Sequence, residues 1–102
     1  MTPEAKVKKR VREVLDDIDA YHFPPFSGGY GRSGVPDIVA CIDGIFVGIE
    51  CKSGKNKLTA IQEYNLQEIE RCGGIALVIN EENINDFKNL IARRLYEIQS
   101  RR

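Results

Sequence analysis

Three charged residues flank a pair of apolar runs near the middle of the chain. Asp37 lies at the start of the run "PDIVACI", and Glu50 and Lys52 lie at the end of the run "IFVGIECK". Only Asp43-Gly44 separates the two runs, and Asp-Gly between apolar runs is the strongest short-range signal for a β-hairpin. We therefore expect the three charges to lie together at the end of one hairpin, away from its turn.

A two-residue turn fixes which residues of this hairpin face each other. The expected pairs are Ile42 with Ile45, Cys41 with Phe46, Ala40 with Val47, Val39 with Gly48, and Ile38 with Ile49. The next pair is Asp37 with Glu50, whose like charges destabilise the sheet unless another group compensates them. Because side chains alternate between the two faces of a strand, Lys52 falls on the same face as Glu50.

The spacing alone leaves two explanations of this charge cluster open. Two converging carboxylates suit a hard divalent cation, and oxygen ligands favour Mg²⁺ or Mn²⁺ over zinc. Alternatively, the cluster is structural and Lys52 neutralises the two acids. Gly48, on the same strand, would let another group approach closely, which adds weak support for a binding site.

Two predicted helices each carry a polar residue on their apolar stripe. Residues 3–19 have apolar side chains at three- and four-residue intervals, and Glu4 extends that stripe. Residues 59–72 form a second helix, in which Gln62 interrupts the apolar stripe. A polar side chain on a core-facing stripe lowers stability unless it is hydrogen-bonded. Glu4 and Gln62 are therefore candidate members of the same site.

The rest of the pattern completes an α/β fold in one domain, residues 1–102. Residues 21–27 contain Pro24-Pro25 between aromatic residues, which predicts an irregular or edge strand. "IALVIN" predicts a buried strand, and residues 83–100 predict an amphipathic helix. The order of elements predicts an α/β sandwich, with a central mixed sheet of about four strands flanked by helices.

Composition restricts the class of protein. Apolar residues make up 42% and charged residues 29%, which is ordinary for a globular protein. The 15 basic and 15 acidic residues give zero net charge, which on average argues against a dedicated nucleic-acid binder. No apolar run approaches the ~20 residues of a membrane span. The acid Glu4 stands where a signal peptide would carry its basic region, so we expect a cytoplasmic protein with no membrane partner. The three cysteines show neither metal-site nor disulfide spacing.

The glycine-rich segment "GGYGRSGVPD", residues 28–37, contains the pattern G-x-G-x-x-G of dinucleotide-binding proteins. In those proteins the pattern opens a helix, whereas here Val35-Pro36 leads directly into a β run. We therefore expect no nucleotide cofactor. The glycines instead predict an approach to Asp37 that leaves room for a phosphate backbone.

Together these residues resemble a known nuclease motif. "GVPDIVACIDGIFVGIECK" resembles the P-D … E-x-K motif of the PD-(D/E)XK nuclease superfamily, with Pro36-Asp37 and Glu50-Cys51-Lys52. The helix "PEAKVKKRV", the G-x-P-D form of the first motif and "LTAIQ" after the second resemble the VRR-NUC branch, and within it the short stand-alone proteins encoded by phages. The resemblance runs from Glu4 to about Ile79, and it implies a restriction-endonuclease-like form of the sandwich.

The resemblance implies a metal site and a catalytic role for each candidate. Asp37 and Glu50 would bind Mg²⁺ or Mn²⁺, with the main-chain carbonyl of Cys51 as a further ligand and Glu4 joining directly or through water. This arrangement corresponds to metal-assisted hydrolysis of a phosphodiester.

The same resemblance assigns the remaining polar residues and the substrate. Lys52 would orient or polarise the attacking water, and Gln62 would hold the nucleophile, the lysine or a nearby phosphate. The family implies a homodimer that cuts four-way (Holliday) junctions symmetrically, in the host cytoplasm if the protein is phage-encoded. The alternatives are a flap-, nick- or less selective DNA nuclease, and a DNA-binding module that has a nuclease-like fold but does not cut.

Basic side chains near these residues are candidate contacts to DNA phosphates. They are Arg32, Lys55, Lys57 and the basic residues of the run Lys6 to Arg12, Lys6, Lys9 and Arg10 above all, with Tyr30 as a candidate stacking surface. Phosphate contacts position DNA without reading its sequence. We therefore expect selectivity for DNA structure over DNA sequence.

Overall fold

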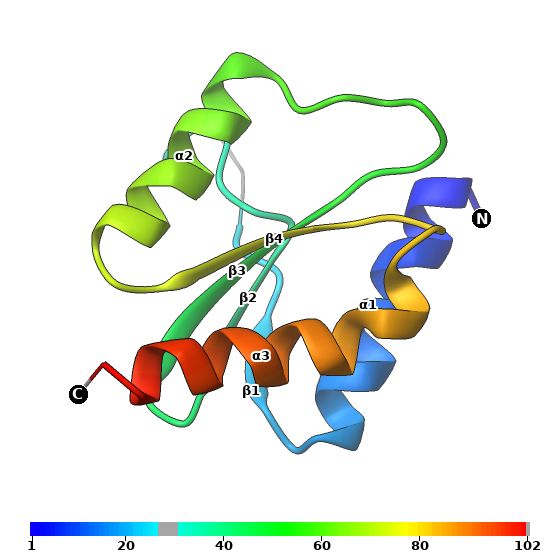
Figure 1. Cartoon of the computed structure of the whole chain (residues 1–102). Helices are drawn as coiled ribbons and strands as arrows, with labels where there is room; N and C mark the ends of the chain where they lie inside the picture. The colour runs from blue at the N-terminus through cyan, green and yellow to red at the C-terminus, as the bar shows by residue number, and fades with distance from the viewer. Residues whose placement is uncertain (27–30, 102) are drawn as a thin grey trace.

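The computed structural model describes residues 1–26 and 31–101, and these form an α/β fold (Figure 1). In chain order the elements are α1 (Pro3–Asp17), β1 (Tyr21–Phe23), β2 (Ile38–Ile42), β3 (Ile45–Cys51), α2 (Ala60–Arg71), β4 (Ile75–Ile79), the short 3₁₀ helix η1 (Ile84–Asp86) and α3 (Phe87–Gln99). The four strands make one mixed sheet flanked by helices. The predicted fold class is confirmed at this level. No helix in these two stretches is long and apolar enough to cross a membrane.

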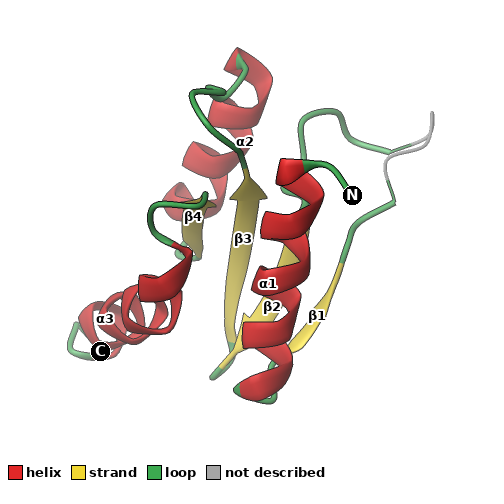
Figure 2. Cartoon of the chain, turned by 90° about the vertical axis from the view of Figure 1, so that its right-hand side faces the viewer, coloured by secondary structure: helices red, strands yellow, loops and turns green. Residues whose placement is uncertain are grey.

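The sheet has the strand order β1-β2-β3-β4, which Figure 2 shows from right to left. The first three strands are antiparallel, and β4 returns parallel to β3 after the crossover through α2. All five predicted pairs of the β2–β3 hairpin are confirmed, from Ile42 with Ile45 to Ile38 with Ile49. Asp43 and Gly44 have φ values of 52° and 78°. A type I′ turn requires positive φ at both central residues, which explains why Asp-Gly sets this register.

Helices cover both faces of the sheet. On one face, α1, η1 and α3 pack against alternate side chains of the strands and bury the main core: Val7, Val11, Leu15, Ile38, Ala40, Ile45, Val47, Ile49, Cys51, Ile75, Leu77, Ile79, Ile84, Phe87, Ile91 and Leu95. On the other face, α2 packs over β3 and β4. The side chains of β3 that point toward α2 include Glu50, because they alternate with the core-facing ones.

Some element boundaries differ from those predicted. β1 is shorter than the predicted strand 21–27, and α1 ends at Asp17 rather than at residue 19. The predicted helix 83–100 is divided into η1 and α3. After β4, the backbone N–H of Asn80 donates to the Asn83 side chain, and the N–H of Asn83 donates to the Asn80 side chain. Such local side-chain bonds compete with helical ones, so the regular helix begins later.

Gly48 allows α2 and the segment before β2 to approach β3 closely. A β-carbon at this position would lie 2.5 Å from Cδ1 of Ile69 and 2.9 Å from Cγ of Pro36. These distances are shorter than carbon contacts allow, so a side chain would push α2 or Pro36 away. Gly48 therefore has a packing role, whereas the sequence pattern alone lends weak support to a binding site.

Replacing Gly48 tests this packing. We expect Gly48→Ala to lower the free energy of unfolding by about 1–3 kcal/mol through overpacking. Ile69→Val removes the atom nearest to the new methyl group and by itself costs about 0.5–1.5 kcal/mol. Urea unfolding of the single and double variants should show that the double variant loses less than the sum of the two. Strictly additive losses would contradict the proposed clash.

Candidate active site

The three predicted catalytic residues of the hairpin lie at one end of the sheet. Asp37 directly precedes β2, Glu50 is the penultimate residue of β3, and Lys52 directly follows β3. The N-terminal turns of α1 and α2 reach the same end from opposite faces of the sheet, and they carry Glu4 and Gln62. The hairpin therefore supplies three of these residues, and one helix from each layer supplies another.

Asp37 closes the hairpin with its side chain. The regular ladder ends at the pair of Ile38 with Ile49, so the predicted pairing of Asp37 with Glu50 does not continue it. Instead, Oδ2 of Asp37 accepts a hydrogen bond of 2.9 Å from the backbone N–H of Cys51. Oδ1 of Asp37 lies 3.4 Å from Nζ of Lys8 on α1. One carboxylate thus joins the end of β3 to the first helix.

Glu50 is the most deeply buried acid described, with 2% of its surface exposed. Its Oε1 accepts a hydrogen bond of 3.3 Å from Nε2 of Gln62, whereas its Oε2 is buried and has no hydrogen-bond partner within the described part of the chain. Burial raises the pKa of Glu50 to about 8, and the nearby carboxylate of Asp37 acts in the same direction. A buried acid without a full set of partners holds its proton, because the charged form loses more hydration than its contacts return.

Gln62 has two hydrogen-bonding roles at the start of α2. It is the third residue of the helix and forms a capping box, in which its Oε1 accepts from the N–H of Thr59 and its own N–H donates to the Thr59 hydroxyl. Its Nε2 donates to Glu50. The polar residue on the apolar stripe is therefore hydrogen-bonded at both ends, and the cap orients it toward Glu50.

Lys8 belongs to the run Lys6 to Arg12 that was predicted to contact phosphates, but its position between two site acids was not predicted. Its Nζ lies 3.4 Å from Asp37 and 3.9 Å from Oε2 of Glu4, so it bridges two predicted site acids. Glu4 also raises the pKa of Glu50, although less than burial and Asp37 do. The signal that could have found Lys8 is its spacing, because residues four apart lie on the same face of a helix and Glu4 was already a candidate.

Cys51, at the end of β3, faces the site with its backbone only. The thiol of Cys51 faces the core, and burial raises its pKa to about 12, so it is no nucleophile at neutral pH. The next residue, Lys52, donates its N–H to Ile79 of β4. Because successive peptide groups of a strand point toward opposite neighbours, the N–H and the carbonyl of Cys51 both point toward the side of Asp37. Lys52 is partly buried, and its charge lowers the pKa of Glu50.

The predicted DNA-contact residues are more dispersed than the catalytic ones. Lys55 and Lys57 are exposed in the loop after β3, at the same end of the sheet as the acids. Arg32 instead lines a hollow with Phe46 and Glu68, beside the C-terminal half of α2 and the start of β3. The prediction that Arg32 lies near the acids rested on its place in the chain before Asp37, which does not determine how the segment folds.

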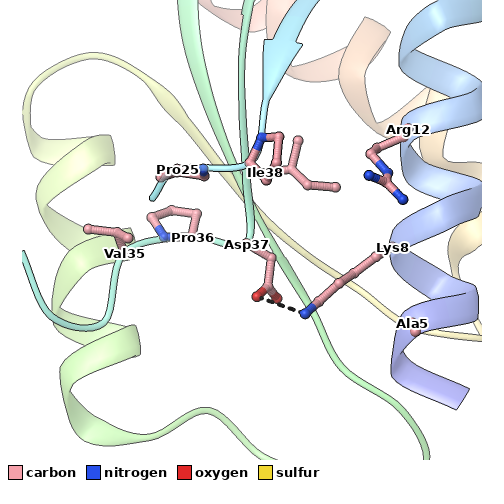
Figure 3. Close-up of a pocket in the computed structure, with 9 residues that line it drawn as sticks. Ala5, Lys8, Arg12, Pro25, Val35, Pro36, Asp37 and Ile38 are labelled. Atoms are coloured by element: carbon pink, nitrogen blue, oxygen red, sulfur yellow. Dashed lines mark ion pairs between the residues drawn. The ribbon is translucent and has the colours of Figure 1, made fainter. Parts of the chain in front are cut away.

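The basic residues of α1 divide between two sides of the helix. Arg10 donates to Asn85 at 2.7 Å, and together with Lys6 it lines a hollow beside η1. Lys9 is exposed. Lys8 and Arg12, by contrast, line the cavity beside Asp37 (Figure 3). Tyr30 lies outside the described residues.

The oxygen atoms of Asp37, Glu50 and Cys51 match the ligands that a hard cation prefers. Within residues 1–26 and 31–101, no group of three or more His, Cys, Asp or Glu side chains is arranged to hold a metal ion. Asp37 and Glu50 are a pair of carboxyl groups at one end of the sheet, and Oε2 of Glu50 is buried without a hydrogen-bond partner among the described residues. The carbonyl of Cys51 is a further oxygen on the side of Asp37. These are hard oxygen donors of the kind that Mg²⁺ and Mn²⁺ prefer.

Comparison with known proteins does not assign this chain to a family. A scan of protein-family models finds no match for this chain, and a search of the curated proteins finds none. The function of the site is therefore argued from its own residues and from the motif resemblance.

The burial of Glu50 predicts a pH dependence of stability in the absence of divalent cations. Its pKa is about 8 in the folded protein, against the ordinary value of 4.5. The folded state therefore keeps a proton that the unfolded state releases, and its contribution to stability is present below pH 4.5 and is lost as the pH rises toward 8. The slope of this loss is at most about 1.4 kcal/mol per pH unit.

Glu50→Gln should remove that slope. In EDTA, we expect urea unfolding to show that the free energy of unfolding of the variant rises steadily relative to that of the wild type between pH 5 and pH 8. Glu13→Gln, which removes an exposed acid of α1, is the matched control and should keep the wild-type slope. Parallel pH profiles of Glu50→Gln and the wild type would contradict a buried carboxyl with a raised pKa.

Proposed function

We propose that the protein is a metal-dependent DNA endonuclease of the VRR-NUC type, which hydrolyses phosphodiester bonds with Mg²⁺ or Mn²⁺. The observation that carries the proposal is Glu50, a nearly fully buried carboxyl with one unpartnered oxygen beside Asp37. Leaving a buried polar atom without a partner lowers stability by about 1–3 kcal/mol. Because this oxygen has no hydrogen-bond partner among the described residues, it is available to a cation, which supports a metal site over a purely structural ion cluster.

Each residue of the site has a role in this reaction. Asp37, Glu50 and the carbonyl of Cys51 would hold the cation, which when bound would neutralise charge on the scissile phosphate and make a water molecule more acidic. Gln62 fixes the position of the Glu50 carboxyl through its hydrogen bond. Lys52 follows β3 and acts on Glu50 by its charge, and its ammonium would stabilise negative charge that develops on the phosphate.

The proposed substrate is branched DNA, with the four-way junction first among the candidates and a homodimer as the active form. This part of the proposal follows from the motif resemblance and from size, because a domain of 102 residues could hardly reach both strands that a junction resolvase must cut. Lys55 and Lys57, exposed in the loop after β3, would contact the DNA backbone near the acids.

A cleavage panel tests the activity. Purified protein with Mn²⁺ should cut at least one of a four-way junction, a 5′ flap and a nicked duplex, and light scattering should give twice the monomer mass. We expect Lys52→Ala to lower the cleavage rate by about 10²–10³-fold, as loss of a charge-stabilising donor does elsewhere. Lys88→Ala, on the exposed side of α3, is the matched control and should cut normally. If the wild type cuts none of these DNAs, the protein is at most a binding module.

Metal affinity tests the site separately from the chemistry. Asp37→Asn keeps an acceptor for the N–H of Cys51 but removes the negative charge, so we expect Mn²⁺ binding by calorimetry to weaken at least tenfold. The lost charge–charge attraction to the cation exceeds the ~1.4 kcal/mol that corresponds to that factor. Lys52→Ala should bind Mn²⁺ at least as tightly as the wild type. Equal Mn²⁺ affinity of Asp37→Asn and the wild type would place the cation elsewhere.

A further inference from the structure

A cavity of about 280 Å³ lies beside the carboxylate pair, between α1 and the segment that leads into β2. In Figure 3, Lys8 and Arg12 project from α1 toward this space, and Pro36 and Asp37 form the opposite wall. Pro25, from the segment after β1, closes a further side. None of the roles assigned above uses this cavity, although Asp37 belongs to both.

One wall of the cavity is cationic. Lys8 and Arg12 are one helical turn apart and therefore lie on the same face of α1. Nζ of Lys8 is held 3.4 Å from Asp37, while Arg12 makes no ion pair with any residue that the structure describes. Ala5, one turn before Lys8, also lines the cavity, and its small side chain leaves the space in front of the two cations open.

The other walls are rigid and largely apolar. Pro24, Pro25, Val35 and Pro36 line them, and the ring of a proline has little conformational freedom to lose when a ligand packs against it. The volume lies just below the ~300–1,000 Å³ range of small-molecule sites. A ligand of one or two rings with an anionic group matches this combination of size, charge and apolar surface.

We propose that this cavity binds one nucleotide of the cleaved strand, with its phosphate on Lys8 and Arg12 and its sugar and base against the proline wall. The shared residue Asp37 places this nucleotide next to the phosphate that is cut. Lys8 would then exchange Asp37 for the nucleotide phosphate, and Arg12 would supply a bidentate contact. That the nucleotide belongs to a cleaved strand rests on the proposed nuclease function, whereas its binding does not.

Nucleotide binding without metal is the direct test. Thymidine 3′,5′-bisphosphate is titrated into ¹⁵N-labelled protein in EDTA, and we expect amide shifts at Lys8, Arg12 and Ile38. Arg12→Ala should weaken binding about tenfold, the usual effect of losing a charge-assisted hydrogen bond. Arg101→Ala, which removes the same charge beyond the end of α3, is the control and should bind like the wild type. Equal affinities of the two variants would overturn the proposal.

Two further measurements distinguish binding of a whole nucleotide from binding of a phosphate group alone. Ala5→Leu fills the space without altering any charge and should also weaken binding of the bisphosphate. Undiminished binding to this variant would overturn the assignment of the cavity. Inorganic phosphate should bind at least tenfold more weakly than the bisphosphate, because it makes no contact with the proline wall. Equal affinity would reduce the site to a general anion site and overturn the nucleotide proposal.

The cleavage assay then distinguishes the two proposals. If the wild type cuts DNA and Arg12→Ala has the same KM as Arg101→Ala, the nucleotide subsite is wrong and the nuclease proposal stands. If the bisphosphate binds as expected and the wild type cuts no DNA, the nucleotide site stands and the nuclease proposal is wrong. An increase in KM of Arg12→Ala with little change in kcat would support both.

Discussion

The carboxyl group of Glu50 is buried at the end of the central strand β3, and the contacts of the site follow from that burial. Gln62 reaches one oxygen from α2, and Asp37 closes the neighbouring strand by binding the next backbone N–H. Both helices that supply side chains to the site point their N-terminal turns toward it, and the N-terminal end of a helix favours negative charge. The fold thus collects acids at one place and surrounds them with donors and positive partial charges, yet it leaves one oxygen of Glu50 unpartnered.

Lys8 gives the site a second layer of charge compensation. It touches both Asp37 and Glu4, whereas Lys52 acts on Glu50 from the same strand. A cation in contact with an acid that would hold a metal ion competes with the metal for that acid. Lys8 would therefore leave Asp37 to the metal ion only if another anion were available to it, and the cavity that Lys8 shares with Arg12 has room for such an anion. The nucleotide subsite therefore also explains why a lysine occupies this position.

The sequence was sufficient to predict the hairpin part of the site and insufficient for the rest. Asp43-Gly44 admits one register, so the positions of Asp37 and Glu50 could be predicted by counting along two strands. Contacts between layers have no such rule. The partnership of Lys8 with Asp37 depends on how α1 crosses the end of the sheet, and the placement of Arg32 beside Glu68 depends on how the chain reaches Pro36. Neither is encoded in local periodicity.

Zero net charge is compatible with nucleic-acid binding once the ion pairs are located. The basic residues of α3 are matched by acids, since Arg93 pairs with Asp86, Arg94 with Glu70 and Lys88 with Asp17. These exposed pairs add little stability, but they remove the helix as a source of positive potential. The cations of α1 that face the cavity lie instead beside the site, where DNA would meet them first. The proposed complex with DNA would therefore have few phosphate contacts, and its affinity would depend only weakly on salt.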